Sequence, residues 1–332
     1  MLESETLYRA KAIGIILMVL GHALYPDIFW RRFIYLFHMP MFYVLSGYLF
    51  NDKYLQDGKT FIIKRIKGLY VPYVKFGLAF ILLHNIFCHF YLLADDGYTV
   101  KETIIRMLRN FFFIENESLL GATWFLRSLF MTAIIYYVSI RLMRLLTKNL
   151  LLCNVVVLVV AFVLGSLLHL LHISLPFWTD REVFCVSFFA LGKVVQAGQF
   201  KLPSRLWLIP LLLIGLVVLN HFTIVKLHAN DIGNPLLTFA AVLLGTYLVL
   251  LVAHYIKTKP LGYVGRKTLP ILIWHLLLFK IVTLLMILLY GLPITTLTSF
   301  PVVYDYPYWW IAYCIIGIGG SLLLAKVPVL SK

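Results

Sequence analysis

The chain has 332 residues, of which 62% are hydrophobic and 13% are charged, and its mean hydropathy is +0.92. A soluble domain is typically about 45–50% apolar and about 25% charged, so the composition excludes an ordinary soluble protein and indicates a lipid bilayer as the surroundings. The net charge of +15 does not indicate a nucleic-acid partner, because basic residues collect on the cytoplasmic loops of membrane proteins.

Ten apolar segments follow one another along the chain, and each is predicted to be a transmembrane helix, which takes about 20 apolar residues. The segments are 11–27, 33–50, 70–93, 123–143, 151–172, 183–199, 206–222, 234–256, 268–290 and 307–325. We therefore expect an all-α polytopic membrane protein with about ten transmembrane helices, folded as a single domain over residues 1–332. The loop 94–122 contains an amphipathic run, VKETIIRMLRNFFFI, which is predicted to lie at the membrane interface.

Lysine and arginine are unevenly divided between the two sides of this arrangement. With the N-terminus inside, they are more than twice as frequent in the inner segments as in the outer loops. The positive-inside rule then places both termini in the cytoplasm. Arg9 and Lys11 precede the first apolar run as in a signal peptide, but no cleavage site follows, so we expect a retained helix.

The four cysteines predict neither a disulfide framework nor a metal site. Cys88, Cys153, Cys185 and Cys314 lie far apart, in or beside apolar segments, and form no C-x-x-C pair. This spacing is typical of cysteines that serve as small buried hydrophobic residues. We expect no bound metal.

Two histidines lie near the outer ends of the first two predicted helices. His22 is about five residues from the end of the first helix and His38 about five from the start of the second, so both are about 7–8 Å below the outer edge. An ionisable residue inside a span is costly and marks a candidate functional site. We predict that the two rings are neighbours with a shared function. The alternatives are coincidence, or rings that bind each other or water at the interface.

Three basic residues are candidates for binding an anionic ligand from the cytoplasm. Lys11 lies about 16 Å nearer the cytoplasm than His22 along one helix. Lys64 and Arg65 belong to the run IIKRIKGLYVPY. The alternative reading is structural: a lysine extended to the lipid headgroups and an ordinary positive-inside anchor.

Arg127 in TWFLRSLF sits near the outer start of the fourth predicted helix. A buried arginine needs a partner, and Glu115, Glu117 and Asp180 in the outer loops are candidates. Pairing and substrate binding are equally good interpretations of this residue.

Several blocks of the sequence resemble one membrane-protein family. KAIGIILMVLGH (Lys11–His22) and FHMPMFYVLSGYLF (Phe37–Phe50) are similar to the opening signature of the integral-membrane acyltransferase 3 family, in its fucose 4-O-acetylase-like branch. Later blocks also resemble the family, in order: KRIKGLYVPY, TWFLRSLF, FFALGKVVQAG and YVGRKTLPILIWH. One departure is Tyr8, where the branch often has an acidic residue.

The resemblance implies a membrane enzyme that moves an acyl group, commonly acetyl from cytoplasmic acetyl-CoA, to a hydroxyl of a sugar. The implied acceptors are cell-surface glycans or their lipid-linked precursors, and the implied location is the inner (plasma) membrane. By position, His22 matches the essential histidine of the first helix and His38 that of the second. Lys11, Lys64 and Arg65 match basic positions, of which the last two are thought to face coenzyme A. In the similar later blocks, the predicted substrate-binding residues are Trp124, Arg127 and His275.

Acyl transfer to a hydroxyl needs a base, an activated carbonyl and exclusion of water. We predict that His22 is the base and that His38 orients it, holds the acceptor or stabilises the oxyanion. Transient acetylation of His22 is the alternative to direct transfer.

Other classes of membrane protein remain as alternatives. A transporter or flippase of a glycan or acyl intermediate would use intramembrane histidines as a proton path, but paired interrupted helices and an internal repeat are absent from the sequence. A glycan polymerase would be expected to carry a larger, arginine-rich outer loop, and an inactive scaffold would tolerate replacement of His22.

Overall fold

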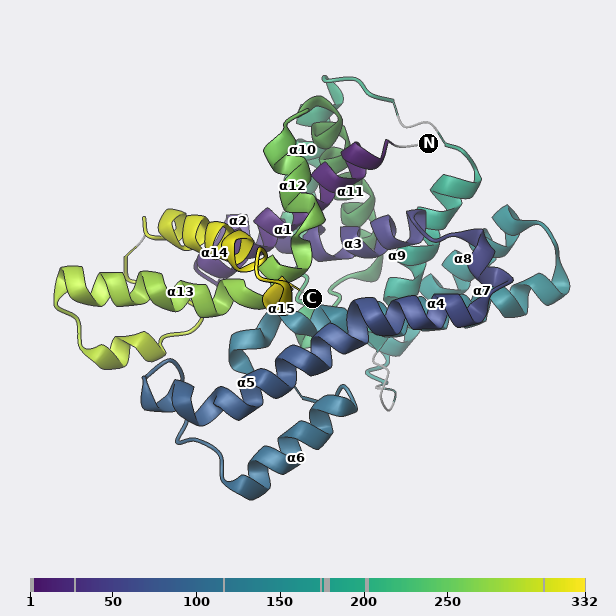
Figure 1. Cartoon of the computed structure of the whole chain (residues 1–332). Coiled ribbons are helices and arrows are strands. Elements are labelled where there is room, and N and C mark those ends of the chain that lie inside the picture. Colours follow the sequence, from purple (N-terminus) through teal and green to yellow (C-terminus); the bar gives the residue numbers. More distant parts are fainter. Residues whose placement is uncertain are drawn as a thin grey trace. The chain divides into compact units, whose positions relative to one another are not determined.

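The computed structural model describes residues 3–26, 28–115, 117–173, 175, 180–200, 203–306 and 308–331 (Figure 1). Over these residues the regular structure is helical, apart from one antiparallel bridge between Lys226 and Asp231. The all-α prediction is therefore confirmed.

Each of the ten predicted segments contains a helix, and the loop 94–122 contains one more. The α-helices are α1 (Ser4–Ala23), α2 (Phe29–Tyr35), α3 (His38–Tyr48), α4 (Gly58–Arg65), α5 (Val71–His89), α6 (Val100–Phe111), α7 (Trp124–Leu146), α8 (Leu150–Leu170), α9 (Asp180–Ala197), α10 (Leu208–Phe222), α11 (Pro235–Tyr255), α12 (Lys259–Arg266), α13 (Thr268–Tyr290), α14 (Trp310–Leu324) and α15 (Pro328–Ser331). Shorter helical turns are η1 (Asp52–Leu55), η2 (Ile66–Tyr70, a π-helix), η3 (Ser118–Thr123), η4 (Leu227–Ala229) and η5 (Ile294–Thr298).

Six helical stretches in the described part of the chain are long and apolar enough to cross a membrane. They are Ser4–Ala23, Gly58–His89, Ser118–Leu146, Leu150–Leu170, Pro235–Tyr255 and Thr268–Tyr290. Two further apolar helices, α10 and α14, are shorter. A membrane protein is thereby supported, while the count of about ten spans and the cytoplasmic termini stay predictions.

The second predicted segment, 33–50, is not one continuous helix. The chain breaks between α2 and α3, where Phe37 has φ −139° and ψ −22°. Pro40 explains the position of the break, because proline has no N–H to donate and is tolerated only in the first turn of a helix. His38 consequently becomes the first residue of α3.

Asparagine side chains cap the N-termini of two long helices. The Oδ1 of Asn149 accepts from the backbone N–H of Leu152, at 3.1 Å, at the start of α8. Asn234 accepts in the same way from Leu236 and Leu237 at the start of α11. Each cap satisfies donors that the first helical turn leaves without an intrahelical partner.

The described residues form two compact units, and α1 and α7 contribute residues to both. The first unit comprises 1–18, 27–66 and 128–266. Within it α3 packs against α9 and α11, and α8 packs along α9. A Cβ on Gly47 would lie 1.8 Å from the carbonyl oxygen of Phe189, and one on Gly192 would lie 1.9 Å from that of Val44. The Ser-Gly and Leu-Gly pairs of the sequence therefore allow the backbones of α3 and α9 to meet.

The second unit comprises 19–26, 67–127 and 267–332. Helix α13 packs against α14, η3 and η5, and Figure 1 shows α13 and α14 side by side. The core of this second unit contains Phe76, Phe80 and Trp274. The indole N–H of Trp274 donates to the carbonyl of Leu330 at 2.9 Å, which ties the end of the chain to α13.

Candidate active site

His22 and His275 form a direct imidazole–imidazole hydrogen bond in the second unit. His22 lies in the last turn of α1 and is half-buried, whereas His275 lies in α13 and is 0% exposed. The Nδ1 of His22 is 2.8 Å from the Nε2 of His275, and the two ring planes differ by only 8°. This distance is that of a well-formed hydrogen bond.

The partner on the other side of His275 fixes where the protons are. Its Nδ1 lies 2.8 Å from the carbonyl oxygen of Ile271. A carbonyl only accepts, so Nδ1 of His275 carries the hydrogen and Nε2 carries the lone pair. His22 must then donate from Nδ1, which leaves the lone pair of the neutral His22 ring on Nε2. The chain of bonds from Ile271 thus sets His22 in the tautomer of a general base.

The other predicted substrate-binding residues belong to the same unit. Trp124 begins α7 directly after η3, and η3 packs on α13, the helix of His275. Arg127 follows one turn later and is half-buried. The structure thus brings the elements that carry Trp124, Arg127 and His275 together in one unit, while their role in binding substrate stays a prediction.

The carboxylates considered as partners for Arg127 contact other groups. Glu115 forms ion pairs with Arg106 and Arg109. Glu117 is 3.0 Å from the Nδ1 of His84, and both side chains are buried. Asp180, the third of these carboxylates, lies 3.0 Å from the Nδ1 of His169.

His38 lies in the first unit and has its own well-defined environment. It is 4% exposed, and its Nδ1 donates to the carbonyl oxygen of Ile34 at 2.8 Å. The ring of Tyr35 lies 5.1 Å from the ring of His38, centroid to centroid. As in His275, the bond to a carbonyl four residues earlier places the lone pair on Nε2. The shared function of His22 and His38 stays a prediction.

Two of the three predicted coenzyme-binding residues lie within electrostatic range of each other. Lys11 of α1 and Arg65 of α4 are both half-buried in the first unit, and their charges interact. Lys64 is exposed, and its Nζ donates to the hydroxyl of Tyr54 at 3.2 Å. The arrangement concentrates positive charge, which suits the phosphates of a nucleotide.

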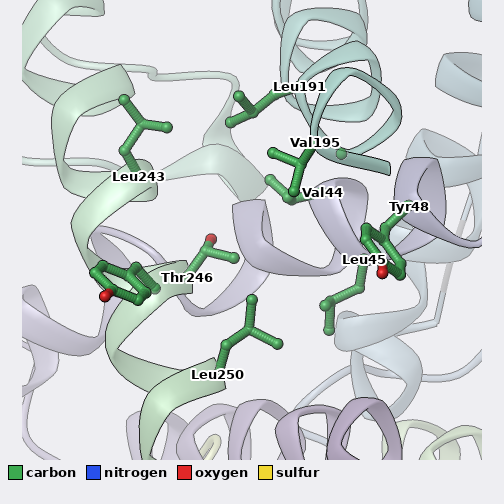
Figure 2. Close-up of a pocket in the computed structure, with 10 residues that line it drawn as sticks. Val44, Leu45, Tyr48, Leu191, Val195, Leu243, Thr246 and Leu250 are labelled. Atoms are coloured by element: carbon green, nitrogen blue, oxygen red, sulfur yellow. The ribbon is translucent and has the colours of Figure 1, made fainter. Parts of the chain in front are cut away.

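An apolar cavity of about 80 Å³ lies among α3, α9 and α11 in the same unit (Figure 2). Its walls include Val44 and Leu45 of α3, Leu191 of α9 and Leu243 and Leu250 of α11. Figure 2 shows these side chains around the space from three helices. A narrow chain of carbon atoms fits such walls better than a polar group does.

Two buried lysines were not singled out from the sequence. The Nζ of Lys280 in α13 donates to the carbonyl oxygens of Leu297 and Ser299, at 2.8 and 2.9 Å, and so holds the end of η5 and the residue after it against α13. Lys193 in α9 forms an ion pair with Asp52 at 2.6 Å. Their signal in the sequence was a charged residue within an apolar run.

No three His, Cys, Asp or Glu side chains gather as metal ligands would within the described ranges. The absence of a metal stays a prediction.

Comparison with known proteins identifies the family. No curated protein and no solved structure matches the chain significantly. The family model described as an acyltransferase domain, that of acyltransferase 3, matches residues 9–326, nearly the whole chain and parts of both units. The protein therefore belongs to the acyltransferase 3 family of membrane acyltransferases.

Proposed function

We propose that the protein is an O-acetyltransferase of the inner (plasma) membrane. It transfers acetyl from cytoplasmic acetyl-CoA to a hydroxyl of a cell-surface glycan or of its lipid-linked precursor. The observation that carries the proposal is the hydrogen-bond chain from the Ile271 carbonyl through His275 to His22. That chain supports a neutral imidazole with a basic Nε2, the group that acyl transfer to a hydroxyl needs.

The reaction follows from this tautomer. The acceptor oxygen attacks the thioester carbonyl carbon while its proton passes to Nε2 of His22. The resulting oxyanion collapses, the carbon–sulfur bond breaks, and the thiolate of coenzyme A leaves. The proton on Nε2 then passes to that thiolate, which restores the base. The lone pair on the same Nε2 would attack the thioester in the alternative route, in which His22 is transiently acetylated.

The donor is assigned to the first unit. Lys11, Lys64 and Arg65 would hold the phosphates of coenzyme A, because ammonium and guanidinium groups form charge-assisted bonds with phosphate. The cavity among α3, α9 and α11 offers apolar walls for part of the pantetheine arm. Trp124 and Arg127 would contact the acceptor, and His38 would hold the acceptor by accepting a hydrogen bond at Nε2.

The test uses inverted membrane vesicles that contain the host's lipid-linked glycans and receive acetyl-labelled acetyl-CoA. Label should enter glycan with the native chain and fall by about 10²–10⁴-fold with His22→Ala, the usual contribution of a general base. The matched control is His89→Ala, which removes an exposed histidine at the end of α5 and should leave labelling unchanged. Equal labelling by the native chain and His22→Ala would refute the role of His22. Absence of label with the native chain would favour a transporter or flippase.

A further inference from the structure

The loop between α10 and α11 is held in place by an unusually dense set of polar contacts. Arg181 of α9, only 4% exposed, donates to the carbonyl of Leu227 at 2.9 Å. The backbone N–H of Arg181 donates to the side chain of Asn230 at 3.3 Å. Within the loop, Lys226 and Asp231 exchange two backbone hydrogen bonds. These hydrogen bonds fix the conformation of the loop, and thereby the positions of its side chains.

This loop places His228 beside the start of α3. The ring of Tyr35 lies 6.3 Å from the ring of His228 and 5.1 Å from that of His38. The guanidinium of Arg31, one turn earlier on α2, lies 5.2 Å from the centre of the Tyr35 ring. Tyr35 is thus surrounded by two imidazoles and a cation from α2, α3 and the loop.

The charges of Arg31, Lys226 and Arg181 lie close to His228. Burial and then the nearby charges of Arg31 and Lys226 lower the pKa of His228 below its ordinary value. The side chain of Arg181 is ion-paired with Glu182, so Arg31 and Lys226 supply the cationic character. Of the other acids on these elements, Asp180 contacts His169, and Asp231 accepts from the backbone N–H of Gly233 at 2.8 Å.

The position of this charge is unexpected for structural cations. The loops with Arg31 and Lys226 are predicted to face the outside, where the positive-inside rule makes basic residues scarce. The predicted donor-binding residues Lys64 and Arg65 follow the other end of α3, which rises about 15 Å from His38 to Tyr48. The two groups of cations are therefore suited to two different anionic ligands.

We propose that Arg31 and His228, which flank Tyr35 beside His38, form together with the nearby Lys226 a phosphate-binding site for the acceptor. A phosphate of the lipid-linked acceptor would accept hydrogen bonds from the guanidinium and the ammonium. Its negative charge would also favour a second proton on His228. The assignment to the acceptor rests on the proposed function; binding of phosphate by these residues does not.

The test measures binding of inorganic diphosphate by calorimetry to the full chain in nanodiscs of zwitterionic phosphatidylcholine, without acyl donor and with saturating coenzyme A, which occupies the predicted donor-binding residues. Arg31→Gln and Lys226→Gln should each weaken binding by about tenfold or more, the usual effect of one charge-assisted bond. Lys101→Gln is the matched control, because it removes the same charge from an exposed position on α6. It should leave binding unchanged.

Absence of binding by the native protein would overturn the proposal, as would equal binding by all variants. A second arm uses nanodiscs that contain anionic phosphatidylglycerol. Binding of diphosphate that persists there supports the acceptor as the source of the phosphate. Competition by the anionic lipid would assign the site to a lipid headgroup and overturn the assignment to the acceptor. Because no acyl transfer is measured, loss of this site and loss of the proposed enzymatic activity are separable results.

Discussion

His275→Leu tests the hydrogen-bond chain that sets the tautomer of His22. Leucine is close to histidine in size and suits the apolar surroundings of His275 in α13, so the chain should still fold, with a free energy of unfolding lowered by about 1–3 kcal/mol because the partners of the ring are left unsatisfied. The substitution leaves Nδ1 of His22 without its acceptor. A hydrogen bond to a charged group contributes about 1.5–3 kcal/mol. The ring of His22 becomes charged when it accepts the proton, so loss of the acceptor should slow acyl transfer by about 10- to 150-fold.

The assay is acyl transfer by the purified chain at saturating acetyl-CoA, with the thermal unfolding midpoint measured on the same samples. His275→Gln is the conservative control, because its amide oxygen can take the place of Nε2 as acceptor. This variant should retain most of the activity that His275→Leu loses, and its unfolding midpoint should lie closer to that of the native chain.

The double variant His22→Ala/His275→Leu decides whether His275 acts through His22. If it does, the double variant should be no slower than His22→Ala alone, because the two residues work as one unit. Multiplied losses in the double variant would refute the reasoning, and so would equal activity of the leucine and glutamine variants.

Three further predictions concern the framework. Gly47→Ala should fail to yield folded protein by size-exclusion chromatography in detergent, because its methyl group would overlap the carbonyl of Phe189, 1.8 Å away. Tyr136→Phe should lower the free energy of unfolding by about 1–3 kcal/mol in denaturant titrations, because it leaves the buried Oδ1 of Asn154 without the hydroxyl that donates to it at 2.6 Å; unchanged stability would contradict this. Lys280→Met should speed hydrogen exchange at the end of η5, where the carbonyls of Leu297 and Ser299 lose their donor, and unaltered exchange would show that other contacts hold this segment.

The helices themselves were accessible from the sequence because each follows from a local pattern. Apolar runs bounded by polar stretches located a helix in every predicted segment. The break before α3 was not predicted, because the residues before and after it are equally apolar. Pro40 was the available signal, because a proline inside a helical pattern marks a helix start nearby.

The candidate site was less accessible because it depends on contacts between distant residues. His22 was singled out as an ionisable residue within an apolar run, and His275 through the resemblance of its block to the family. Their hydrogen bond joins positions 253 residues apart, and no local pattern encodes such a contact. The positions of Lys226 and His228 were not predicted for a similar reason, because the conformation of their loop depends on a contact with Arg181 of α9.

The helical stretch Gly58–His89 has 32 residues, and at about 1.5 Å per residue it extends about 48 Å. The hydrocarbon core of a bilayer is only about 30 Å thick, a difference too large for a moderate tilt to absorb. α5, which has 19 residues, suffices for the apolar core. The residues before it, which include Lys64 and Arg65, are then not needed to cross the hydrocarbon. Water-soluble phosphates can reach cations that lie outside the hydrocarbon without entering the lipid.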